Sequence, residues 1–370
     1  MKKEYLLDVC DAYQPQTIAA KNLKGGQYPV YGANGIIGYH TAFNHESPEL
    51  VMGCRGTCGA LHITAPFSWI NGNAMVIHPK KGVNLSRQYL YYAILSESLR
   101  DVITGTANPQ ITQTNLKKLC ISTCDDSEQA RIVARIEEMF SQLDAGVETL
   151  KKTKTQLAVY RQAVLKEAFS QVSNYGSERI KTLCQNIVDC PHSTPKWAKD
   201  GYLCLRTTNF KRGILDLSEK NYVTKETFDT RNARLVPLPG DVLYSREGAI
   251  LGIACIIPED TYVCLGQRMM LLRPSKKLNN RYLMHYLNSP TVTSFVTSIT
   301  GGSASPHVNV ADIKSFIIPC PEIRVQERIV MEIDSRISVC DSIEQTVDIT
   351  LQQAEAMRQS ILKDAFEGRL

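Results

Sequence analysis

The chain has 370 residues, of which 43% are hydrophobic and 21% charged; this composition is that of a folded protein and excludes an intrinsically disordered one. Its length is more than one ordinary core holds and predicts two domains with connecting structure. The net charge of +5, from 42 Lys+Arg and 37 Asp+Glu, neither requires nor excludes a nucleic-acid partner, because such binding depends on where the basic side chains gather.

The start of the chain and its main apolar run argue against export and membrane insertion. Glu4 and Asp8 interrupt the segment in which a signal peptide would carry its apolar core. The apolar run 249–257 is far shorter than the ~20 residues that span a membrane as a helix. We therefore expect a cytoplasmic protein with no membrane partner.

Residues 1–124 form the first predicted domain. Short apolar runs such as 50–53 alternate with Gly, Asn and Pro turns, which is typical of β-strands, and 87–100 has a helical pattern. The domain is therefore predicted to be α+β. Its loops carry side chains that can hydrogen-bond base edges, namely Tyr31, Asn34, Arg55, Thr57, Asn71 and Asn73. Lys21 and Lys24 would suit phosphates; for each of these residues the alternative is a solvated turn or a packing role.

A Pro-centred loop, residues 104–113, ends this domain and combines flexible glycine with hydroxyl and amide groups. It supplies the better DNA-binding candidates of the first half: Thr106, Asn108, Gln110, Thr112 and Gln113. The run Asn108-Pro109-Gln110 approaches the Asn/Asp-Pro-Pro-aromatic motif of amino-methyltransferases. It lacks the second proline and the aromatic ring that would stack on a flipped base, so we expect this loop to bind rather than to catalyse.

Residues 125–170 are predicted to form one long helix. Ile136, Phe140, Leu143 and Val147 recur every three or four residues, and the segment contains no proline. Acidic residues at its start favour a helix N-terminus there. About 42 helical residues extend about 60 Å at 1.5 Å per residue. A short polar linker is expected at 171–177.

Residues 178–321 form the second predicted domain, again α+β, with a strand pattern at 241–244 and a helical pattern at 280–296. Its candidates for base edges are Arg206, Asn209, Arg246, Glu247, Gln267 and Arg268. Its candidates for phosphates are Lys196, Lys199, Lys211 and Arg212. A second Pro-centred loop, 300–309, adds Ser303, Ser305, His307 and Asn309.

A second long helix is predicted over 322–370, and it repeats the first. At an offset of 197 residues, 129–169 aligns with 326–366 without a gap, and 16 of the 41 positions are identical. Composition alone would give roughly two or three identities. Because the same offset aligns the two Pro-centred loops, each half has the same order of globular part, loop and helix.

Helices of this length with narrow apolar seams are not stable alone, and they pack most economically on each other as a coiled coil. A helical element that joins two copies of the chain is the alternative. The gapless duplication, with a globular domain ahead of each copy, favours pairing within one chain. The predicted fold class is α+β, with two pseudo-repeated domains of mixed strands and short helices joined by two long helices.

No catalytic or metal-binding motif accompanies these elements. The sequence has no Gly-x-Gly-x-x-Gly, Walker or Gly-x-Ser-x-Gly motif. The twelve cysteines include Cys54-x3-Cys58 and Cys120-x3-Cys124, but neither has a partner pair at zinc-site spacing. The others stand singly in apolar settings typical of buried structural thiols. We expect no catalysis, no metal and no cofactor in this chain.

These features together resemble a known family. The segment 28–38, the Pro-centred loops, Gln-x-Arg-Ile-Val at 129–133 and 326–330, and Ala-Phe at both helix ends are similar to the specificity subunits of type I restriction–modification enzymes. The resemblance extends over nearly the whole chain. The recognition domains of this family vary so widely that it implies no base preference.

The resemblance implies a function as well as a fold. Two inverted target-recognition domains, joined by an antiparallel helix pair, would each read one half of a bipartite site in double-stranded DNA. The helices would dock two methyltransferase subunits that use S-adenosylmethionine and, through these, restriction subunits that use ATP and Mg²⁺. The alternatives are the specificity subunit of a type IIB-like or methylation-only system and, from a different class, a coiled-coil scaffold or regulator.

Overall fold

The structure, a computed structural model, describes residues 1–19, 21, 23, 25–105, 108–301 and 306–370. These residues fall into two compact units. Unit 1 comprises Met1–Lys151 and Asp348–Leu370, and unit 2 comprises Lys152–Val347. None of the helices described here is both long and apolar enough to cross a membrane.

Two long helices, α4 (Asp126–Ser170) and α10 (Ile323–Phe366), each belong partly to both units. The sequence patterns predict the helices as segments separate from the domains. In the structure the division into compact units falls within both helices: α4 passes from unit 1 to unit 2 after Lys151, and α10 passes from unit 2 to unit 1 after Val347. A unit is therefore an α+β domain together with part of each long helix.

Unit 1 contains short elements besides the helices. In chain order they are β1 (Lys2–Tyr5), α1 (Leu6–Val9), β2 (Cys10–Tyr13), β3 (Tyr28–Gly32), β4 (Gly35–His40), β5 (Leu50–Gly53), β6 (Leu61–Ile63), β7 (Trp69–Ile70), β8 (Ala74–Pro79), α2 (Arg87–Leu95), β9 (Ile103–Thr104), β10 (Gln110–Ile111), α3 (Gln113–Leu116) and β11 (Cys120–Thr123). The central sheet is antiparallel with the order β2-β8-β5-β6. A second sheet has the order β4-β3-β7, and β3 and β7 in it are parallel.

Unit 2 repeats this plan with additions. In chain order it contains β12 (Ser177–Arg179), α5 (Ile180–Leu183), β13 (Cys184–Asp189), β14 (Trp197–Ala198), β15 (Tyr202–Leu205), the 3₁₀ turn η2 (Thr207–Asn209), β16 (Phe210–Lys211), β17 (Ile214–Leu215), β18 (Tyr222–Val223), α6 (Lys225–Asn232), β19 (Val242–Ser245), β20 (Ala254–Ile256), β21 (Cys264–Leu265), β22 (Met269–Pro274), α7 (Asn280–Leu287), α8 (Pro290–Thr300), α9 (Val310–Ser315) and β23 (Ile317–Pro319). The central sheet has the order β13-β22-β19-β20, and the second sheet the order β14-β18-β15-β21.

The two domains share one topology although their globular sequences differ. The central sheets have the same strand order, and each second sheet contains one parallel pair, β3 with β7 and β15 with β21. The first strand of each domain pairs with the last, as β1 with β11 and β12 with β23. The predicted fold class, two repeated α+β domains with two long helices, is confirmed.

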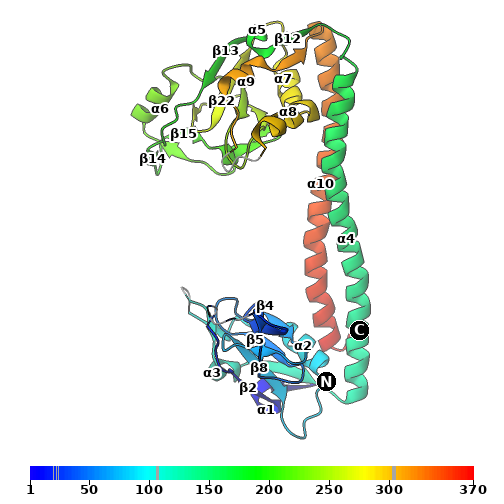
Figure 1. The fold of residues 1–370 in the computed structure, drawn as a ribbon. Coiled ribbons are helices and arrows are strands. Elements are labelled where there is room, and N and C mark those ends of the chain that lie inside the picture. The colour runs from blue at the N-terminus through cyan, green and yellow to red at the C-terminus, as the bar shows by residue number, and fades with distance from the viewer. Residues whose placement is uncertain (20, 22, 24, 106–107, 302–305) are drawn as a thin grey trace. The chain divides into compact units, whose positions relative to one another are not determined.

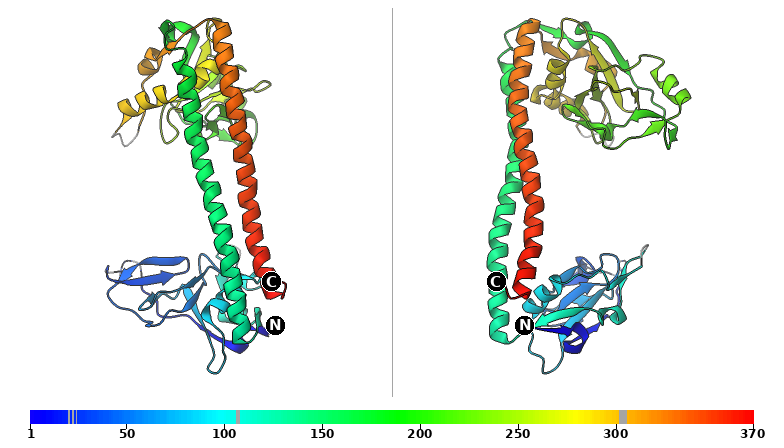
Figure 2. Two further views of the ribbon diagram at one scale, coloured as in Figure 1. Left: turned by 90° about the vertical axis from the view of Figure 1, so that its right-hand side faces the viewer. Right: turned by 180° about the vertical axis from the view of Figure 1, so that it is seen from behind.

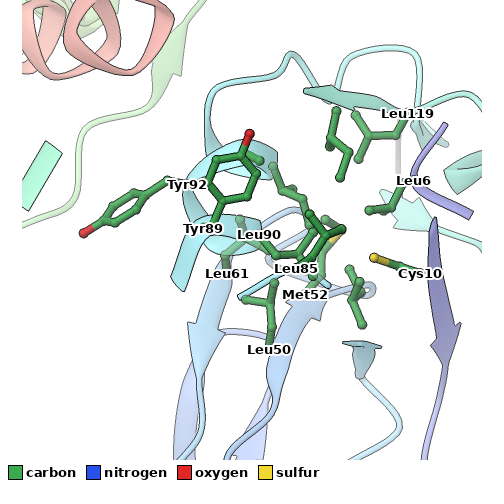
Figure 3. Close-up of a cluster of buried hydrophobic side chains, with 14 of the residues drawn as sticks. Leu6, Cys10, Leu50, Met52, Leu61, Leu85, Tyr89, Leu90, Tyr92 and Leu119 are labelled. Atoms are coloured by element: carbon green, nitrogen blue, oxygen red, sulfur yellow. The ribbon is translucent and has the colours of Figure 1, made fainter. Parts of the chain in front are cut away.

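Alternate residues of the central strands are buried on opposite faces of each sheet, as a strand period of two requires. In unit 1, Leu50 and Met52 face the core that contains Tyr89 of α2 (Figure 3), while Val51 faces a small cluster with Val76. In unit 2 the strand β19 divides in the same way between two cores. Burial on both faces explains why these strands read as continuous apolar runs in the sequence.

One predicted helix is broken in the structure. The pattern over 280–296 predicts a single helix, but α7 ends at Leu287 and α8 begins at Pro290. Proline has no N–H to donate and is favoured in the first turn of a helix, where that donor would have no partner. Pro290 therefore ends the preceding helical pattern and starts a new helix.

The long helices run antiparallel and side by side within each unit (Figure 1, Figure 2). In unit 2, Arg161 of α4 donates to Asp341 of α10 (2.6 Å) and also pairs with Glu344 (2.8 Å). In unit 1, Arg358 of α10 pairs with Asp144 of α4. These arginines and aspartates are identical positions of the repeat. The same ion pair therefore occurs in both units: α4 supplies the arginine in unit 2, and α10 supplies it in unit 1.

Apolar residues of the repeat pack the helix ends onto the domains. In unit 1, Phe366 of α10 lies against Tyr89 of α2, with ring centroids 5.3 Å apart. In unit 2, Phe169 of α4 lies against Tyr282 of α7 at 5.2 Å. Each of these side chains is almost fully buried, and burial of such a ring contributes about 1.5–3 kcal/mol.

A glutamine at the start of each helix fixes the helix to its domain. Buried Gln129 accepts from the N–H of Ser86 (2.8 Å) and donates to two backbone carbonyls. Buried Gln326 accepts from the N–H of Asn279 (2.8 Å) and donates to the carbonyls of Lys277 (2.9 Å) and Pro321 (2.8 Å). The repeated glutamine is therefore a structural connector.

We expect the substitution Gln326→Leu to lower the free energy of unfolding by about 3 kcal/mol. Leucine keeps most of the volume but leaves one buried N–H and two carbonyls without partners, at about 1–3 kcal/mol for each unsatisfied group. Urea unfolding followed by circular dichroism measures the change. The exposed Gln352 is the control, and Gln352→Leu should change stability by less than about 0.5 kcal/mol. Equal losses in the two variants would contradict the connector role.

Candidate nucleic-acid interface

In unit 1, the adjoining ends of the two central strands, β5 and β8, are bound to the Pro-centred loop by backbone hydrogen bonds. The N–H of Cys54 donates to the carbonyl of Asn73 (2.9 Å), and the N–H of Ile111 donates to the carbonyl of Cys54 (3.0 Å). Arg55, in the turn after β5, is thereby bridged to Gln110 of the loop. We call this part the hairpin edge of unit 1, defined by Gln14, Arg55, Asn73 and Gln110.

Unit 2 has the same edge at the equivalent backbone positions. The N–H of Arg246 donates to the carbonyl of Arg268 (3.0 Å), and the N–H of Val308 donates to the carbonyl of Arg246 (2.8 Å). Glu247 is bridged to His307 of the second Pro-centred loop. The hairpin edge of unit 2 is defined by Asp189, His192, Glu247, Arg268 and His307.

The edge of unit 1 offers exposed hydrogen-bonding groups around a small hollow. The hollow measures about 120 Å³ and is lined by Ala12, Tyr13, Gln14, Arg55, Met75, Gln110, Ile111, Thr112 and Gln113. Arg55 and Asn73 are exposed, and among the described residues no acidic side chain pairs with Arg55. A guanidinium and an amide on a fixed backbone are groups that can read base edges.

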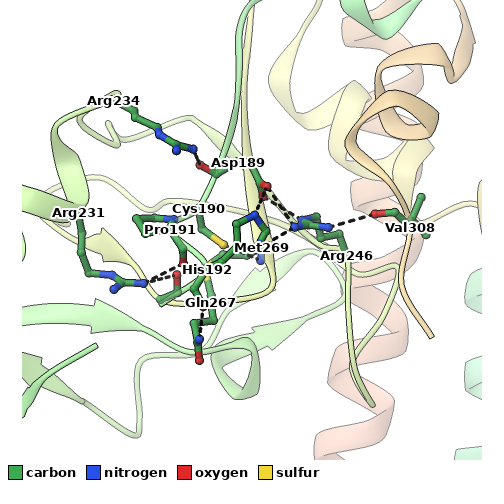
Figure 4. A network of polar contacts seen from close by, with 11 residues as sticks. Asp189, Cys190, Pro191, His192, Arg231, Arg234, Arg246, Gln267, Met269 and Val308 are labelled. Atoms are coloured by element: carbon green, nitrogen blue, oxygen red, sulfur yellow. Dashed lines mark hydrogen bonds and ion pairs between the residues drawn. The ribbon is translucent and has the colours of Figure 1, made fainter. Parts of the chain in front are cut away.

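Two buried arginines hold the edge of unit 2 together (Figure 4). Arg246, with a side chain 8% exposed, binds the two carboxylate oxygens of Asp189 at 2.9 and 3.1 Å and donates to the carbonyl of Val308 (3.4 Å). Arg231 donates to the carbonyls of Leu265 (2.6 Å) and Gly266 (2.8 Å) and to two in the loop 191–193. These arginines fix the loops from inside.

His192 is left exposed at the end of this network. Its side chain is 67% exposed, and its Nε2 lies 3.1 Å from Asp189. The carbonyl of His192 accepts a hydrogen bond from Gln267, as Figure 4 shows. Gln14, His192 and Arg231 are not among the residues that the sequence indicates, because each lies among other polar residues and meets its partners only in the fold.

Several sequence candidates hold the fold internally. Buried Asn71 accepts from the N–H of Ile18 (3.1 Å) and donates to its carbonyl (2.9 Å). Buried Asn209 donates to two backbone carbonyls, and the hydroxyl of buried Tyr31 accepts a backbone hydrogen bond. With Arg246, these buried residues support the loops from inside through hydrogen bonds within the fold.

The remaining candidates lie at or near the surface. Arg206 is stacked on Trp197, 5.5 Å from its ring centre, and Lys211 pairs with Asp216. Exposed candidates besides those of the hairpin edges are Lys21, Asn34, Thr57, Asn108, Gln113, Lys196, Lys199, Arg206, Lys211, Arg212 and Asn309. Thr112 and Gln267 are partly buried. Lys24, Thr106, Ser303 and Ser305 lie outside the described residues.

The cysteines behave as structural thiols in the part of the chain that the structure describes. All twelve are free of disulfide bonds, and burial raises the pKa of the Cys10 and Cys184 thiols to about 12. A thiol with so high a pKa is neither a good nucleophile nor a ready metal ligand. No group of three or more His, Cys, Asp or Glu side chains among the described residues could hold a metal ion.

Each unit also has a groove beside its helix pair, at matching positions. The groove of unit 2 measures about 800 Å³ and includes Arg161, Ser338 and Asp341 in its lining. That of unit 1 measures about 720 Å³ and includes Ser141, Asp144 and Arg358. All three residue pairs are identities of the repeat, so the grooves form a matched pair lined in part by the same side chains.

We expect Arg246→Met to lower the stability of unit 2 by about 3 kcal/mol or more, because the largely buried carboxylate of Asp189 loses its buried arginine and keeps only the exposed His192 beside it. Thermal and urea unfolding measure the loss. Arg268→Met removes an exposed arginine from the same edge and should cost less than about 0.5 kcal/mol. If both variants were equally stable, Arg246 would not have the structural role assigned to it.

The sequence is similar to known proteins over most of its length. The family model described as type I restriction modification DNA specificity domain matches residues 2–158 and 189–353. The EcoBI specificity subunit of Escherichia coli is 25% identical over 94% of this chain and 78% of its own length. The EcoKI specificity subunit of E. coli K12 is 22% identical over 100% of this chain and 85% of its own length.

Solved structures show the same fold at low sequence identity. A chain from a type I restriction–modification system, described for its complex assembly and conformational transition, has a TM-score of 0.72 and 16% identity, and the match covers 100% of this chain and 98% of that one. The HsdS subunit from Thermoanaerobacter tengcongensis has a TM-score of 0.53 and 17% identity, with 100% and 97% covered. Because the family model matches most of the sequence, the chain belongs to the family of type I restriction–modification DNA specificity proteins.

Proposed function

We propose that this chain selects the target sequence of a type I restriction–modification complex, and that each unit reads one half of a bipartite site in double-stranded DNA. One observation carries this proposal. The same hairpin edge occurs in both units on the same backbone frame, but its side chains differ, as Arg55 and Glu247 do at equivalent positions. A repeated frame with different side chains suits the reading of two different half-sites.

The hairpin edges are the parts of each unit best suited to base contacts. Their side chains other than those of Asp189 and Glu247 are exposed, while the loops beneath them are fixed by backbone bonds and, in unit 2, by buried arginines. Functional side chains are commonly placed on loops that a rigid scaffold positions. The exposed basic residues outside the edges, including Lys21, Lys196 and Lys199, would contact phosphates, which fix register without reading sequence.

The matched grooves suit two copies of one partner. Since three lining residues of each groove are identities of the repeat, a surface that contacts these side chains in one groove finds the same groups in the other. We propose that a modification methyltransferase subunit docks in each groove and that restriction subunits join through these. S-adenosylmethionine would then bind to the methyltransferase, and ATP with Mg²⁺ to the restriction subunit.

The purified chain should neither methylate nor cut DNA, and it should confer sequence-specific adenine methylation when it is mixed with its cognate modification subunit. Incorporation of the labelled methyl group of S-adenosylmethionine, followed by single-molecule sequencing, measures both the rate and the site. The control is the modification subunit alone. Methylation or cleavage by the purified chain without a partner would refute the assignment.

The grooves can be tested with two equivalent exposed serines, Ser141 and Ser338. Either Ser141→Arg or Ser338→Arg should remove one bound modification subunit, because a long charged side chain fills the groove, and the double variant should remove both. Native mass spectrometry counts the bound subunits. Ser335→Arg, at an exposed position of α10 outside the lining, is the control. A double variant that still binds two subunits would show that docking occurs elsewhere.

A further inference from the structure

The two hairpin edges carry their arginine on different strands. In unit 1, Arg55 is in the turn after β5, and Asn73 precedes β8. In unit 2, Glu247 takes the position of Arg55, and Arg268 takes that of Asn73. The frame therefore keeps an exposed arginine at the edge of each unit, and among the described residues an acidic side chain pairs with it in unit 2 alone.

The backbone around Arg268 is held in a conformation that L-residues rarely adopt. Its φ is +67°, a left-handed value that costs about 1–3 kcal/mol for a bulky residue and persists only where the surroundings enforce it. The carbonyl of Arg268 accepts from Arg246 (3.0 Å). At Gly266, two residues earlier, an added Cβ would lie 2.1 Å from the carbonyl oxygen of Leu205, so this segment packs closely against the end of β15.

The side chain of Arg268 is positioned by Glu247 and by the turn at Gly248. Its Nε lies 3.5 Å from the carboxylate of Glu247, yet the side chain remains 56% exposed. Its Nη1 would be 3.4 Å from a Cβ added to Gly248, so the guanidinium lies close over the turn where a glycine leaves room for it. The Nε side of the fork faces Glu247, and no described residue accepts a hydrogen bond from the two terminal nitrogens, which could therefore bind a ligand.

Two kinds of group on DNA could accept hydrogen bonds from the terminal nitrogens of Arg268, namely a phosphate or a base edge. The carboxylate of Glu247 would repel a phosphate held by the same guanidinium, whereas a neutral base edge meets no such repulsion. In the major groove, guanine presents two adjacent acceptors, O6 and N7, that match the two donors of an arginine fork. The geometry at this edge therefore favours guanine over phosphate.

We propose that Arg268 reads a guanine in the half-site of unit 2 and that Glu247 is the positioning residue that orients its guanidinium. This proposal rests on the proposed function of the chain. It assigns one base to one half-site, and it assigns no such carboxylate-oriented contact to Arg55 in unit 1. The half-site of unit 2 must then contain a G·C pair that depends on Arg268.

The test uses the full chain in complex with its modification subunit and maps methylation on a library of randomised sites. Arg268→Ala should lower discrimination at one G·C position about 5- to 150-fold, the range for one bidentate contact, and leave the other half-site unchanged. Arg268→Lys, which keeps the charge but not the fork, should lose most of the same discrimination. Glu247→Gln should relax that same position to a smaller extent. Arg55→Ala, the control, should not affect it.

Three results would overturn the inference. One is a wild-type half-site without a G·C pair that depends on Arg268. The second is an Arg268→Ala complex that binds all sequences more weakly by one factor, with a salt dependence reduced by about one phosphate contact. The third is a Glu247→Gln variant that relaxes no position. In these cases the proposed function still stands, because the wild-type complex methylates a defined site. If the wild-type complex showed no sequence preference, the proposed function itself would fail.

Discussion

The fold depends on the antiparallel pairing of α4 and α10 within each unit. Neither helix has an apolar face wide enough for a helix of more than 40 residues to be stable alone in water. The repeat pairs the two helices in both units by the same ion pair: Arg161 pairs with Asp341 in unit 2, and Arg358 pairs with Asp144 in unit 1. Such exposed ion pairs add little stability; they select the register in which the apolar residues of both helices face each other.

The same repeat joins each domain to its helices. Gln129 and Gln326 bind three backbone groups each, and Phe366 and Phe169 pack on equivalent tyrosines. None of these contacts involves a residue that defines a hairpin edge. The edge can therefore change its side chains without disturbing the frame, which is a physical basis for one scaffold to carry different specificities.

Arginine has two separate roles in unit 2. Arg231 and Arg246 are buried and donate to carbonyls and to Asp189, where the several donors of a guanidinium satisfy groups that burial would otherwise leave unpaired. Arg268 lies on the loops that these residues hold, and its side chain is 56% exposed. Since removal of a buried arginine loosens the edge, loss of binding after a mutation is informative only when stability is measured as well.

The sequence by itself determined the repeat, the two long helices and the α+β character of both domains. Helix and strand periodicity are local properties of the chain, and a gapless duplication can be read directly by aligning the sequence with itself. The sequence also indicated the Pro-centred loops. It could not separate Arg246 from Arg268, or Asn71 from Asn73, since burial depends on which strands meet in space. Only the tertiary structure placed Glu247 beside Arg268 and directed Arg231 to the loop at His192, because residues far apart in the chain approach each other only once the sheets have formed.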